Sequence, residues 1–155
     1  KIHFMKIGIA ADHAGLEQKE KLLELLKNKN FEIQDFGAFE YKSDDDYPDV
    51  VTPLAKALSA HKVDKAIAVC GSGVGVSIVA NKFPGVRAAL ISETYSAHQG
   101  VEHDDMNMIC VGGRVLGTSL ILEIILAFLK AEFQEDERFV RRLNKVLEIE
   151  KEYFK

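Results

Sequence analysis

Five short runs of branched apolar residues alternate with longer amphipathic segments, and this alternation constrains the fold more than any other feature of the sequence. Runs of this length are typical of buried strands, whereas the leucines of segment 16–29 recur at helical spacing. Strands that alternate with helices favour an open parallel sheet with helices on both faces. We therefore predict an α/β fold. The predicted strands are residues 6–11, 31–36, 65–69, 86–91 and 108–111, and the predicted helices are residues 16–29, 49–61, 77–83, 118–132 and 136–154, with mixed loop and helix at 92–105.

The length and charge of the chain limit what it can be. Its 155 residues suffice for one domain of ordinary size. A net charge of −4 gives no reason to expect nucleic acid or an anionic membrane as a partner. No apolar stretch reaches the roughly 18 residues that span a bilayer, no secretory signal is recognisable, and the two cysteines are expected to be free thiols. We expect one cytoplasmic domain over residues 5–155, with residues 1–4 set aside as an expression remnant.

A glycine-rich segment, residues 70–77, directly follows the third predicted strand. Gly71, Gly73 and Gly75 occupy alternate positions, where a backbone turns sharply or comes close to a ligand. A helix that opens near Ser77 would aim free N–H groups and the positive end of its dipole at one spot. That spot favours an anion and the thiolate form of Cys70. The segment therefore indicates either an active site with a base or nucleophile, or a turn beside a buried thiol.

Other ligands are less well supported by the sequence. The glycine spacing matches neither the P-loop, because no Gly-Lys-Ser/Thr follows, nor the dinucleotide pattern, whose third glycine would fall one position later. The acidic run at 44–46 could ligate a hard cation, although such runs are more often solvated loops. We predict no cofactor and no metal ion.

Polar residues follow several of the predicted strands. In an open parallel sheet, ligands bind outside the carboxyl ends of the strands, so these residues are expected to gather at one edge. His103 differs from them because it lies among carboxylates that would orient it. Arg138 and Arg142 are four residues apart and share one face of the terminal helix. The strand-end residues are Asp12, His13, Asp35, Cys70, Gly71, Ser72, Ser92, Glu93 and, a few residues past the fifth strand, Arg114.

Together these residues closely resemble the type B ribose-5-phosphate isomerases, a family that also includes galactose-6-phosphate and allose-6-phosphate isomerase subunits. The resemblance extends over nearly the whole chain from Met5, and its specificity comes from the combination of motifs. The motifs are Asp12-His13-Ala14-Gly15, Asp46-Tyr47-Pro48, residues 70–77, Ala80-Asn81-Lys82-Phe83, Ser92-Glu93-Thr94-Tyr95-Ser96-Ala97, and Asn107 through Gly112-Gly113-Arg114.

The resemblance implies a metal-free aldose–ketose isomerase that acts on a sugar phosphate. It implies a Rossmann-like, three-layer α/β/α fold with a five-stranded parallel sheet and an extra C-terminal helix. The active sites of the family lie at a dimer interface and contain residues of both subunits. We therefore expect a homodimer whose terminal helix, residues 136–155, belongs to the interface, and we leave open whether dimers pair into tetramers.

The resemblance also implies a role for individual residues. Cys70 would be the base that moves a proton between C1 and C2, Ser72 and the loop amides would hold the enediolate, and His103 would be the acid that opens the ring. Asp12 would bind sugar hydroxyls, and a phosphate clamp would consist of His13, Arg114, Arg138 and Arg142. The full set of expected substrate-binding residues is Asp12, His13, Tyr47, Gly71, Ser72, Gly73, Val74, Gly75, Asp104, Arg114, Arg138 and Arg142.

Two positions depart from the family pattern. Asp104 replaces the Asn that commonly follows the ring-opening His, and Phe139 replaces the His of the arginine motif, which also needs one extra residue to align. The expected reaction is the interconversion of D-ribose 5-phosphate and D-ribulose 5-phosphate. The alternatives are an allose- or galactose-6-phosphate isomerase and a non-catalytic sugar-phosphate-binding domain.

Overall fold

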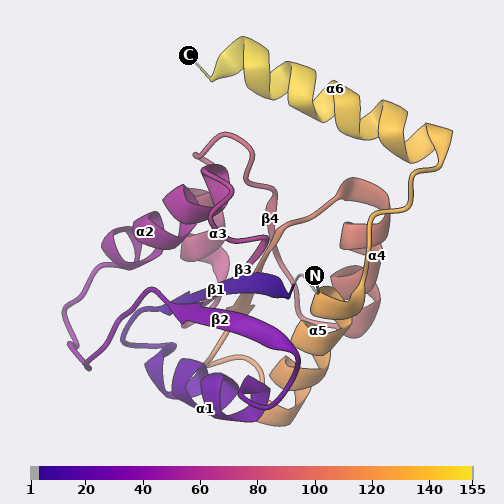
Figure 1. Cartoon of the computed structure of the whole chain (residues 1–155). Coiled ribbons are helices and arrows are strands. Elements are labelled where there is room, and N and C mark those ends of the chain that lie inside the picture. The colour runs from indigo at the N-terminus through magenta and orange to yellow at the C-terminus, as the bar shows by residue number, and fades with distance from the viewer. Residues whose placement is uncertain (1–3, 155) are drawn as a thin grey trace.

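The computed structural model describes residues 4–154, and five parallel strands form one sheet in it (Figure 1). The strands are β1 (Met5–Ala11), β2 (Phe31–Asp35), β3 (Lys65–Cys70), β4 (Ala88–Leu90) and β5 (Met108–Gly112). Their order across the sheet is β2-β1-β3-β5-β4. The predicted five-stranded parallel sheet is therefore confirmed. Of the residues set aside as a remnant, 1–3 lie outside the described part of the chain.

Helices cover both faces of the sheet, which confirms the three-layer arrangement. One apolar core lies between the sheet and α1, α4 and α5, and a second lies between the sheet and α2 and α3. The extra helix α6 lies outside both layers (Figure 1). The helices are α1 (Leu16–Leu26), α2 (Tyr47–Ser59), α3 (Val74–Ala80), α4 (Thr94–Asp104), α5 (Thr118–Lys130) and α6 (Glu137–Tyr153).

The central strand β3 explains how the layers are held together. All six of its residues are buried, as expected for a strand covered on both faces. Successive side chains point to opposite faces, so Ile67 and Val69 enter the core beneath α1, α4 and α5. Ala68 and Cys70 enter the other core. Cys70 therefore faces the layer formed by α2 and α3.

The strand order creates a crevice at the carboxyl ends of β1 and β3. The chain passes from β1 to β2 on one side and then continues through β3 on the other side of β1. Ala11 pairs with Val69, and the N–H of Asp12 donates to the carbonyl oxygen of Val69 at 3.3 Å. The turn after β1 consequently lies beside Cys70, at the position where open α/β sheets bind ligands.

Two helices begin earlier than the sequence pattern predicts. Helix α2 begins at Tyr47 instead of residue 49, because Asp46 has an extended backbone and Pro48 fits the first turn of a helix. Helix α3 begins at Val74 instead of Ser77, because Gly73 adopts a φ of +84° and turns the chain at once. Gly75 therefore lies within the helix and not in a loop before it. Strand β4 is shorter than predicted, with three residues.

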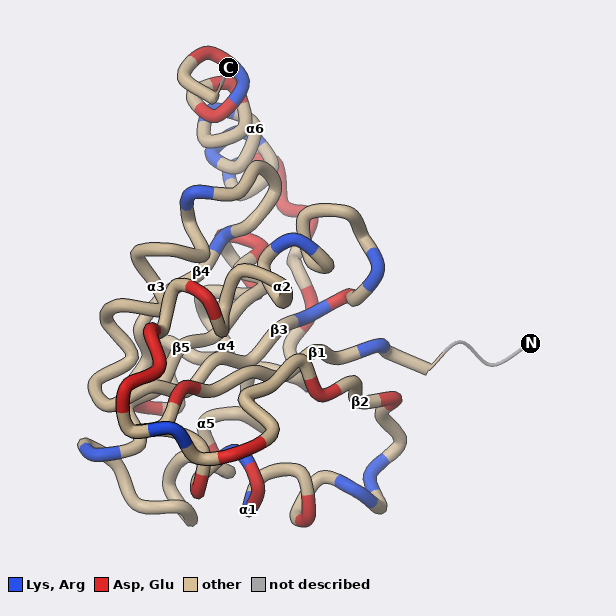
Figure 2. The backbone as a smooth tube through the Cα atoms, turned by 90° about the vertical axis from the view of Figure 1, so that its left-hand side faces the viewer, with Lys and Arg blue, Asp and Glu red and all other residues tan. Residues whose placement is uncertain are grey.

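Helix α6 stands apart from the rest of the molecule in both views (Figures 1 and 2). Among its residues only Phe139 is buried. Near its far end, the carboxylate of Glu150 accepts hydrogen bonds from the N–H of Gly85 at 2.9 and 3.0 Å. Val146 and Ile149 are 50% and 60% exposed. The helix thus has an apolar side that its own chain leaves largely uncovered.

A buried lysine links β3 to α5. The ammonium group of Lys65 donates to the carbonyl oxygens of Phe128 and Ala131 at 2.7 and 2.8 Å, and these are groups that the end of a helix leaves without partners. Burial lowers the pKa of Lys65 to about 8. Across residues 4–154, no helix combines the length and the apolar character needed to cross a membrane.

Candidate active site

Cys70 is the last residue of β3, and its sulfur lies beneath the loop that follows. Sγ accepts a hydrogen bond from the backbone N–H of Gly73 at 3.1 Å, and the residue is 5% exposed. The left-handed backbone of Gly73, which glycine adopts without strain, brings this N–H back over the sulfur. An N–H donor at the sulfur stabilises negative charge on it. The thiol is therefore placed to act as a base.

The rest of the glycine loop is arranged by short-range contacts. The hydroxyl oxygen of Ser72 accepts a hydrogen bond from the N–H of Val74 at 3.2 Å. Gly75 packs against the ring of Tyr47, and a Cβ at Gly75 would lie only 2.8 Å from two ring carbons. A glycine is thus required at position 75 for Tyr47 to reach the loop. This contact brings the beginning of α2 to the same place as Cys70.

Asp12 is a buried carboxylate at the end of β1. Its Oδ1 accepts hydrogen bonds from the N–H groups of Ala14 and Gly15 at 3.0 and 3.1 Å, and the residue is 5% exposed. Burial raises the pKa of Asp12, while the hydrogen bond from Gly15 and the nearby His13 oppose that rise. The two N–H bonds fix the direction of the side chain. Asp12 is thereby held rigidly beside Cys70.

His13 is held by a carboxylate that comes from a distant loop. Its ring Nδ1 lies 2.6 Å from Oδ1 of Asp45, and its backbone N–H donates to the same oxygen at 3.1 Å. An ionised carboxylate only accepts hydrogen bonds, so Nδ1 carries the hydrogen and Nε2 is the nitrogen left for a ligand. The ring of Tyr41 meets His13 edge-on, with the centroids 6.1 Å apart.

Arg114 reaches the site from the turn after β5. The backbone N–H of Arg114 donates to the carbonyl oxygen of Gly71 at 3.0 Å. The backbone N–H of Gly113 donates to the carbonyl oxygen of Cys70 at 2.8 Å. Its side chain passes over Gly71, where a Cβ would lie 3.5 Å from Cδ of Arg114. These groups surround a pocket of about 500 Å³. It is lined by Asp12, His13, Ala14, Tyr47, Cys70, Gly71, Ser72, Gly75, Arg114 and Val115.

Six of the predicted site residues do not line this pocket. Gly73 and Val74 lie in the chain between Ser72 and Gly75, which do line the pocket. Their backbone N–H groups donate hydrogen bonds to Sγ of Cys70 and to the hydroxyl oxygen of Ser72. The other four are on α4 and α6. These are His103, Asp104, Arg138 and Arg142.

His103 lies at the opposite end of the sheet from Cys70. It is in the last turn of α4, shortly before β5 begins at Met108, which pairs with Ala66 at the start of β3. Cys70 is four residues further along β3, about 13 Å at the usual rise of a strand. Within one chain, therefore, His103 cannot act on a sugar bound beside Cys70.

The environment of His103 differs from the one the sequence indicates. Its Nδ1 is 2.9 Å from the amide nitrogen of Gln99, and its ring stacks on Phe139 with centroids 4.0 Å apart. The adjacent Glu102 pairs with His98 instead. Because the amide nitrogen of Gln99 can only donate, Nδ1 accepts, and the neutral ring carries its hydrogen on Nε2. Gln99 and Phe139, and not the neighbouring carboxylates, orient this imidazole.

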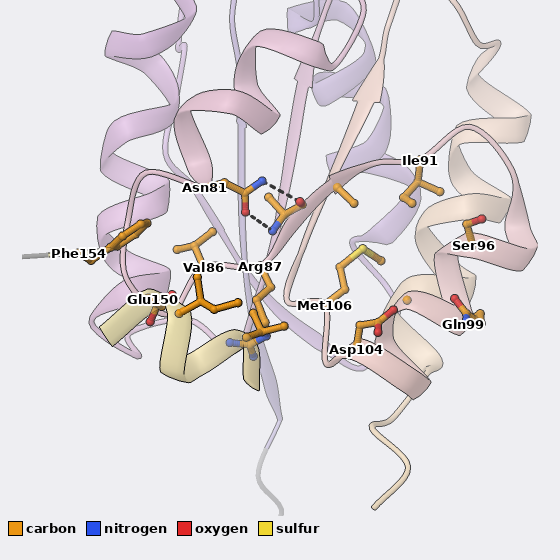
Figure 3. Close-up of a pocket in the computed structure, with 15 residues that line it drawn as sticks. Asn81, Val86, Arg87, Ile91, Ser96, Gln99, Asp104, Met106, Glu150 and Phe154 are labelled. Carbon is orange, nitrogen blue, oxygen red and sulfur yellow. Dashed lines mark hydrogen bonds between the residues drawn. The ribbon is translucent and has the colours of Figure 1, made fainter. Parts of the chain in front are cut away.

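Asp104 lines a second pocket, of about 560 Å³, between α6, α4 and the edge strand β4 (Figure 3). Glu150 of α6 and Phe154, which directly follows that helix, border it on one side and Gln99 on the other (Figure 3). On its floor the amide of Asn81 exchanges hydrogen bonds with the backbone of Ala88 at 2.8 and 2.9 Å. This pocket is mostly apolar and is separate from the one beside Cys70.

One of the two predicted arginines of α6 lies near His103. The guanidinium of Arg138 is 4.6 Å from the ring centroid of Phe139, which in turn stacks on His103. Arg142 is exposed, one turn further along the helix. Phe139, where the family pattern has His, contacts both side chains. His103 and Arg138 are therefore grouped around one ring, and Arg142 follows Arg138 one turn later on α6.

One residue of the acidic run at 44–46, Asp45, contacts His13 at the pocket. Asp45 turns inward, and together with Asp12 and His13 it offers metal-ligating atoms within 4.8 Å of one another. Oδ1 of Asp12 already accepts two N–H bonds and Oδ1 of Asp45 accepts two from His13. Asp45, Gln99 and Phe139 were missed by sequence reasoning. Only Phe139 carried a signal, its departure from the arginine motif.

Most of the chain matches a known protein family. The model of the ribose/galactose isomerase family matches residues 7–146. A solved ribose-5-phosphate isomerase B of Clostridium thermocellum is 43% identical, with a TM-score of 0.91, over 96% of this chain and 99% of that one. That of Mycoplasma genitalium, solved with bound ribulose 5-phosphate, is 39% identical, with a TM-score of 0.91, over 97% and 99%. A D-erythrulose-4-phosphate isomerase of Pectobacterium atrosepticum is 38% identical over 84% of this chain and 86% of its own.

Proposed function

The chain belongs to the ribose/galactose isomerase family of sugar phosphate isomerases, and from that premise we propose that it interconverts D-ribose 5-phosphate and D-ribulose 5-phosphate. The observation that carries the proposal is the position of Cys70, whose sulfur meets the N–H of Gly73 in a pocket shared with Asp12 and Arg114. A base beside hydrogen-bond donors is what proton abstraction next to a carbonyl requires. The Mycoplasma genitalium relative was solved with ribulose 5-phosphate bound.

Cys70 carries the proton in the proposed reaction. In the open-chain aldose, the thiolate removes the proton from C2, and the electrons of that C–H bond form the double bond of an enediolate. The oxygen that gains charge is stabilised by Ser72 and by N–H groups of the glycine loop. The hydroxyl proton on the C2 oxygen moves to the C1 oxygen, and the thiol returns the carbon-bound proton to C1, so that the C2 oxygen becomes the carbonyl of the ketose and the sulfur is again a thiolate. No external oxidant or reductant is needed, because the change is internal to the sugar.

The phosphate would bind at the end of the pocket that contains Arg114 and His13. Arg114 is always protonated and can pair with a phosphate through two N–H groups. Binding energy from this remote group holds C1 and C2 at the sulfur of Cys70, where the chemistry occurs. Asp12, held by two backbone N–H groups, is placed to bind sugar hydroxyls between the two ends.

A second copy of the chain would complete the site. The pocket beside Cys70 lacks the proposed ring-opening acid, while His103 and Arg138 lie apart from it around Phe139, with Arg142 on the same helix as Arg138. Exposed apolar residues also lie around the pocket and on α6, including Ile78, Val115 and Val146 at 55%, 64% and 50%. Exposed apolar surface of this kind is typical of an interface. In a symmetric dimer, the cluster of each subunit can serve the pocket of the other.

A smaller or larger sugar phosphate is the second candidate substrate. The relative from Pectobacterium atrosepticum is named for D-erythrulose 4-phosphate, so members similar to this chain differ in the sugar they use. Allose 6-phosphate and galactose 6-phosphate represent the hexose alternative. In all these cases the chemistry at C1 and C2, and hence the role of Cys70, is the same.

A substrate comparison tests the proposal directly. The purified protein is assayed with ribose 5-phosphate, erythrose 4-phosphate, allose 6-phosphate and galactose 6-phosphate, each with EDTA present. We expect the highest kcat/KM with ribose 5-phosphate and no loss of rate on chelation. A higher kcat/KM with another sugar would assign that substrate instead. Absence of turnover with all four, together with measurable binding, would favour a non-catalytic binding domain.

A further inference from the structure

We propose that Asp45 is a positioning residue that prepares His13 to bind the phosphate of the substrate as a cation. The inference rests on the proposed function, because it takes the anionic end of a sugar phosphate as the ligand. It adds a residue from the polar loop before α2 to a site otherwise formed at the ends of β1, β3 and β5.

The geometry of Asp45 is that of a carboxylate dedicated to one partner. Its Oδ1 accepts both the backbone N–H and the ring Nδ1–H of His13, at 3.1 and 2.6 Å. Its Oδ2 is buried and has no hydrogen-bond partner among residues 4–154. The side chains of His13 and Asp45 are 22% and 12% exposed. A carboxylate with so few donors and so little water around it would be stabilised further by a positive charge on its one neighbour, once that imidazole gains a proton.

The hydrogen bond at Nδ1 also determines which nitrogen a ligand meets. With Nδ1 engaged, Nε2 is the nitrogen left for a ligand, and His13 lines both the pocket beside Cys70 and the adjoining groove of about 580 Å³. Arg114 lines the same two spaces. The two basic side chains therefore border both spaces and can meet an anion bound between them. Asp45 holds the imidazole in this orientation before any ligand arrives.

Phosphate binding would then be coupled to a proton. A neutral imidazole with Nδ1–H at Asp45 presents a lone pair at Nε2, which repels a phosphate oxygen. When Nε2 gains a proton from solvent, the imidazolium lies between two anions and donates a hydrogen bond to each. The negative charge of Asp45 makes this state favourable, because it compensates the added charge. The expected signature is net proton uptake when phosphate binds.

Other charged and titratable groups near His13 must be separated from this effect. Arg114 stays protonated and does not contribute to proton uptake. Asp12 is a competing source, because burial raises its pKa and it lies next to His13. Asp45 contacts the ring of His13 directly, and the other titratable groups that border the two spaces are Asp12, Glu17, Glu20, Lys21, Tyr41, Tyr47, Cys70 and Arg114.

Titration calorimetry with inorganic phosphate tests the coupling without relying on turnover. Binding is measured between about pH 7 and 9 in buffers of different ionisation enthalpy, which gives the number of protons taken up. We expect uptake in the unmodified protein and its loss in Asp45→Asn, which keeps an oxygen at Nδ1 but removes the charge. The affinity for phosphate should fall about tenfold, the size expected for one charge-assisted hydrogen bond.

Three controls make the result decisive. Asp44→Asn removes the same charge from the neighbouring exposed residue and should leave binding and proton uptake unchanged. His13→Gln should abolish uptake, and persistence of uptake there would point to Asp12 and overturn the proposal. Normal affinity and uptake in Asp45→Asn would mean that Asp45 only anchors its loop. In the active enzyme, Asp45→Asn should raise KM about tenfold and change kcat less than about twofold. If the enzyme lacks ribose-5-phosphate turnover but the phosphate results hold, only the proposed substrate fails.

Discussion

The proposed chemistry depends on one sulfur atom, and replacing it is the most direct test at the scale of a single residue. Cys70→Ala removes the base while leaving the glycine loop, Arg114 and His13 in place. We expect turnover to fall at least about a hundredfold, the usual contribution of a positioned base. Binding of phosphate should change little, and a circular dichroism spectrum should be unaltered. Near-normal turnover would refute the assignment.

The second cysteine provides an internal comparison for chemical modification. Cys110 lies in β5 and is 0% exposed, and burial raises the pKa of its thiol. Iodoacetamide reacts with thiolates, so it should modify Cys70 first, and substrate should protect against the loss of activity. Peptide mapping would identify the modified residue. Equal labelling of both cysteines, or a loss of activity that parallels the modification of Cys110, would contradict this view.

The role of His103 can be separated from that of Cys70 by the choice of substrate. Ribose 5-phosphate must open its ring before isomerisation, whereas erythrose 4-phosphate cannot close a furanose ring because its C4 oxygen carries the phosphate. We expect His103→Asn to slow turnover of ribose 5-phosphate about a hundredfold and to affect erythrose 4-phosphate far less. Gln99→Leu should show the same pattern in weaker form, because Gln99 orients the ring. Equal losses on both substrates would assign His103 to a step after ring opening.

Asp104 can be assessed in the same assays. It is exposed and lines the pocket beneath α6, and the partner of His103 Nδ1 is Gln99. If a second subunit brings Asp104 toward the sugar, its negative charge should affect the ring-opening step. The pH–rate profile of Asp104→Asn on ribose 5-phosphate should then show a lower alkaline limit. An unchanged profile would assign Asp104 no part in ring opening.

The residues that could be predicted from sequence are those whose position follows from the topology. Asp12, His13 and Cys70 follow parallel strands, so they had to meet at one edge of the sheet. Asp45 could not be found in this way, because it reaches His13 across 32 residues from an acidic run that looks like a solvated loop. Gln99 could not be identified from the sequence either, because a polar residue one turn before a histidine is common on helices.

At the scale of an element, Lys65 links β3 to the end of α5 through hydrogen bonds. Because this lysine is buried, the free energy of unfolding should depend on pH in a defined way. The pKa of Lys65 is about 8 in the folded chain, against 10.5 for an unperturbed lysine. Between these values the unfolded chain binds more protons, so the free energy of unfolding contributed by this group rises with pH. The full rise is at most about 3 kcal/mol, and partial solvent screening reduces it.

A comparison with Lys65→Met isolates this contribution. Both proteins are unfolded in urea at several pH values from about 7 to 10.5, the range over which the lysine loses its proton. Loss of the bonds to Phe128 and Ala131 lowers the stability of the variant at every pH. Only the unmodified protein should gain stability from Lys65 as pH rises, so the difference between the two should widen. A constant difference would mean that Lys65 is not perturbed by burial.

The element boundaries show where pattern reasoning is less precise. The apolar periodicity located all five strands and every helix except α4, because buried faces must repeat at the period of the backbone; residues 92–105 were predicted as mixed loop and helix, whereas Thr94–Asp104 is helical throughout. The starts of α2 and α3 depend instead on one local conformation each, the extended Asp46 and the left-handed Gly73. Such conformations are decided by neighbouring chain segments, here the contact between Tyr47 and Gly75, which the sequence alone does not display.

At the scale of the whole molecule, the separation of His103 from Cys70 is the feature that calls for a second subunit. One chain holds the proposed base, Cys70, at one end of the sheet and the proposed ring-opening acid, His103, at the other. Helix α6 adds an exposed apolar side that a partner could cover, although its sequence alone could not say where it lies. Sedimentation of a fully active monomer at assay concentration would contradict this arrangement.

Mixing two inactive variants tests whether each site contains residues of both subunits. Cys70→Ala removes the base and His103→Asn the acid, so each homodimer lacks one function at both sites. When the two are unfolded together and refolded in equal amounts, about half of the dimers are mixed, and each of these has one site with neither substitution. We expect recovery of about a quarter of the normal turnover of ribose 5-phosphate. Mixing Cys70→Ala with Asp12→Asn is the matched control, because both residues line the same pocket and every site keeps one defect. No recovery in the first mixture, or equal recovery in both, would mean that each subunit forms its site alone.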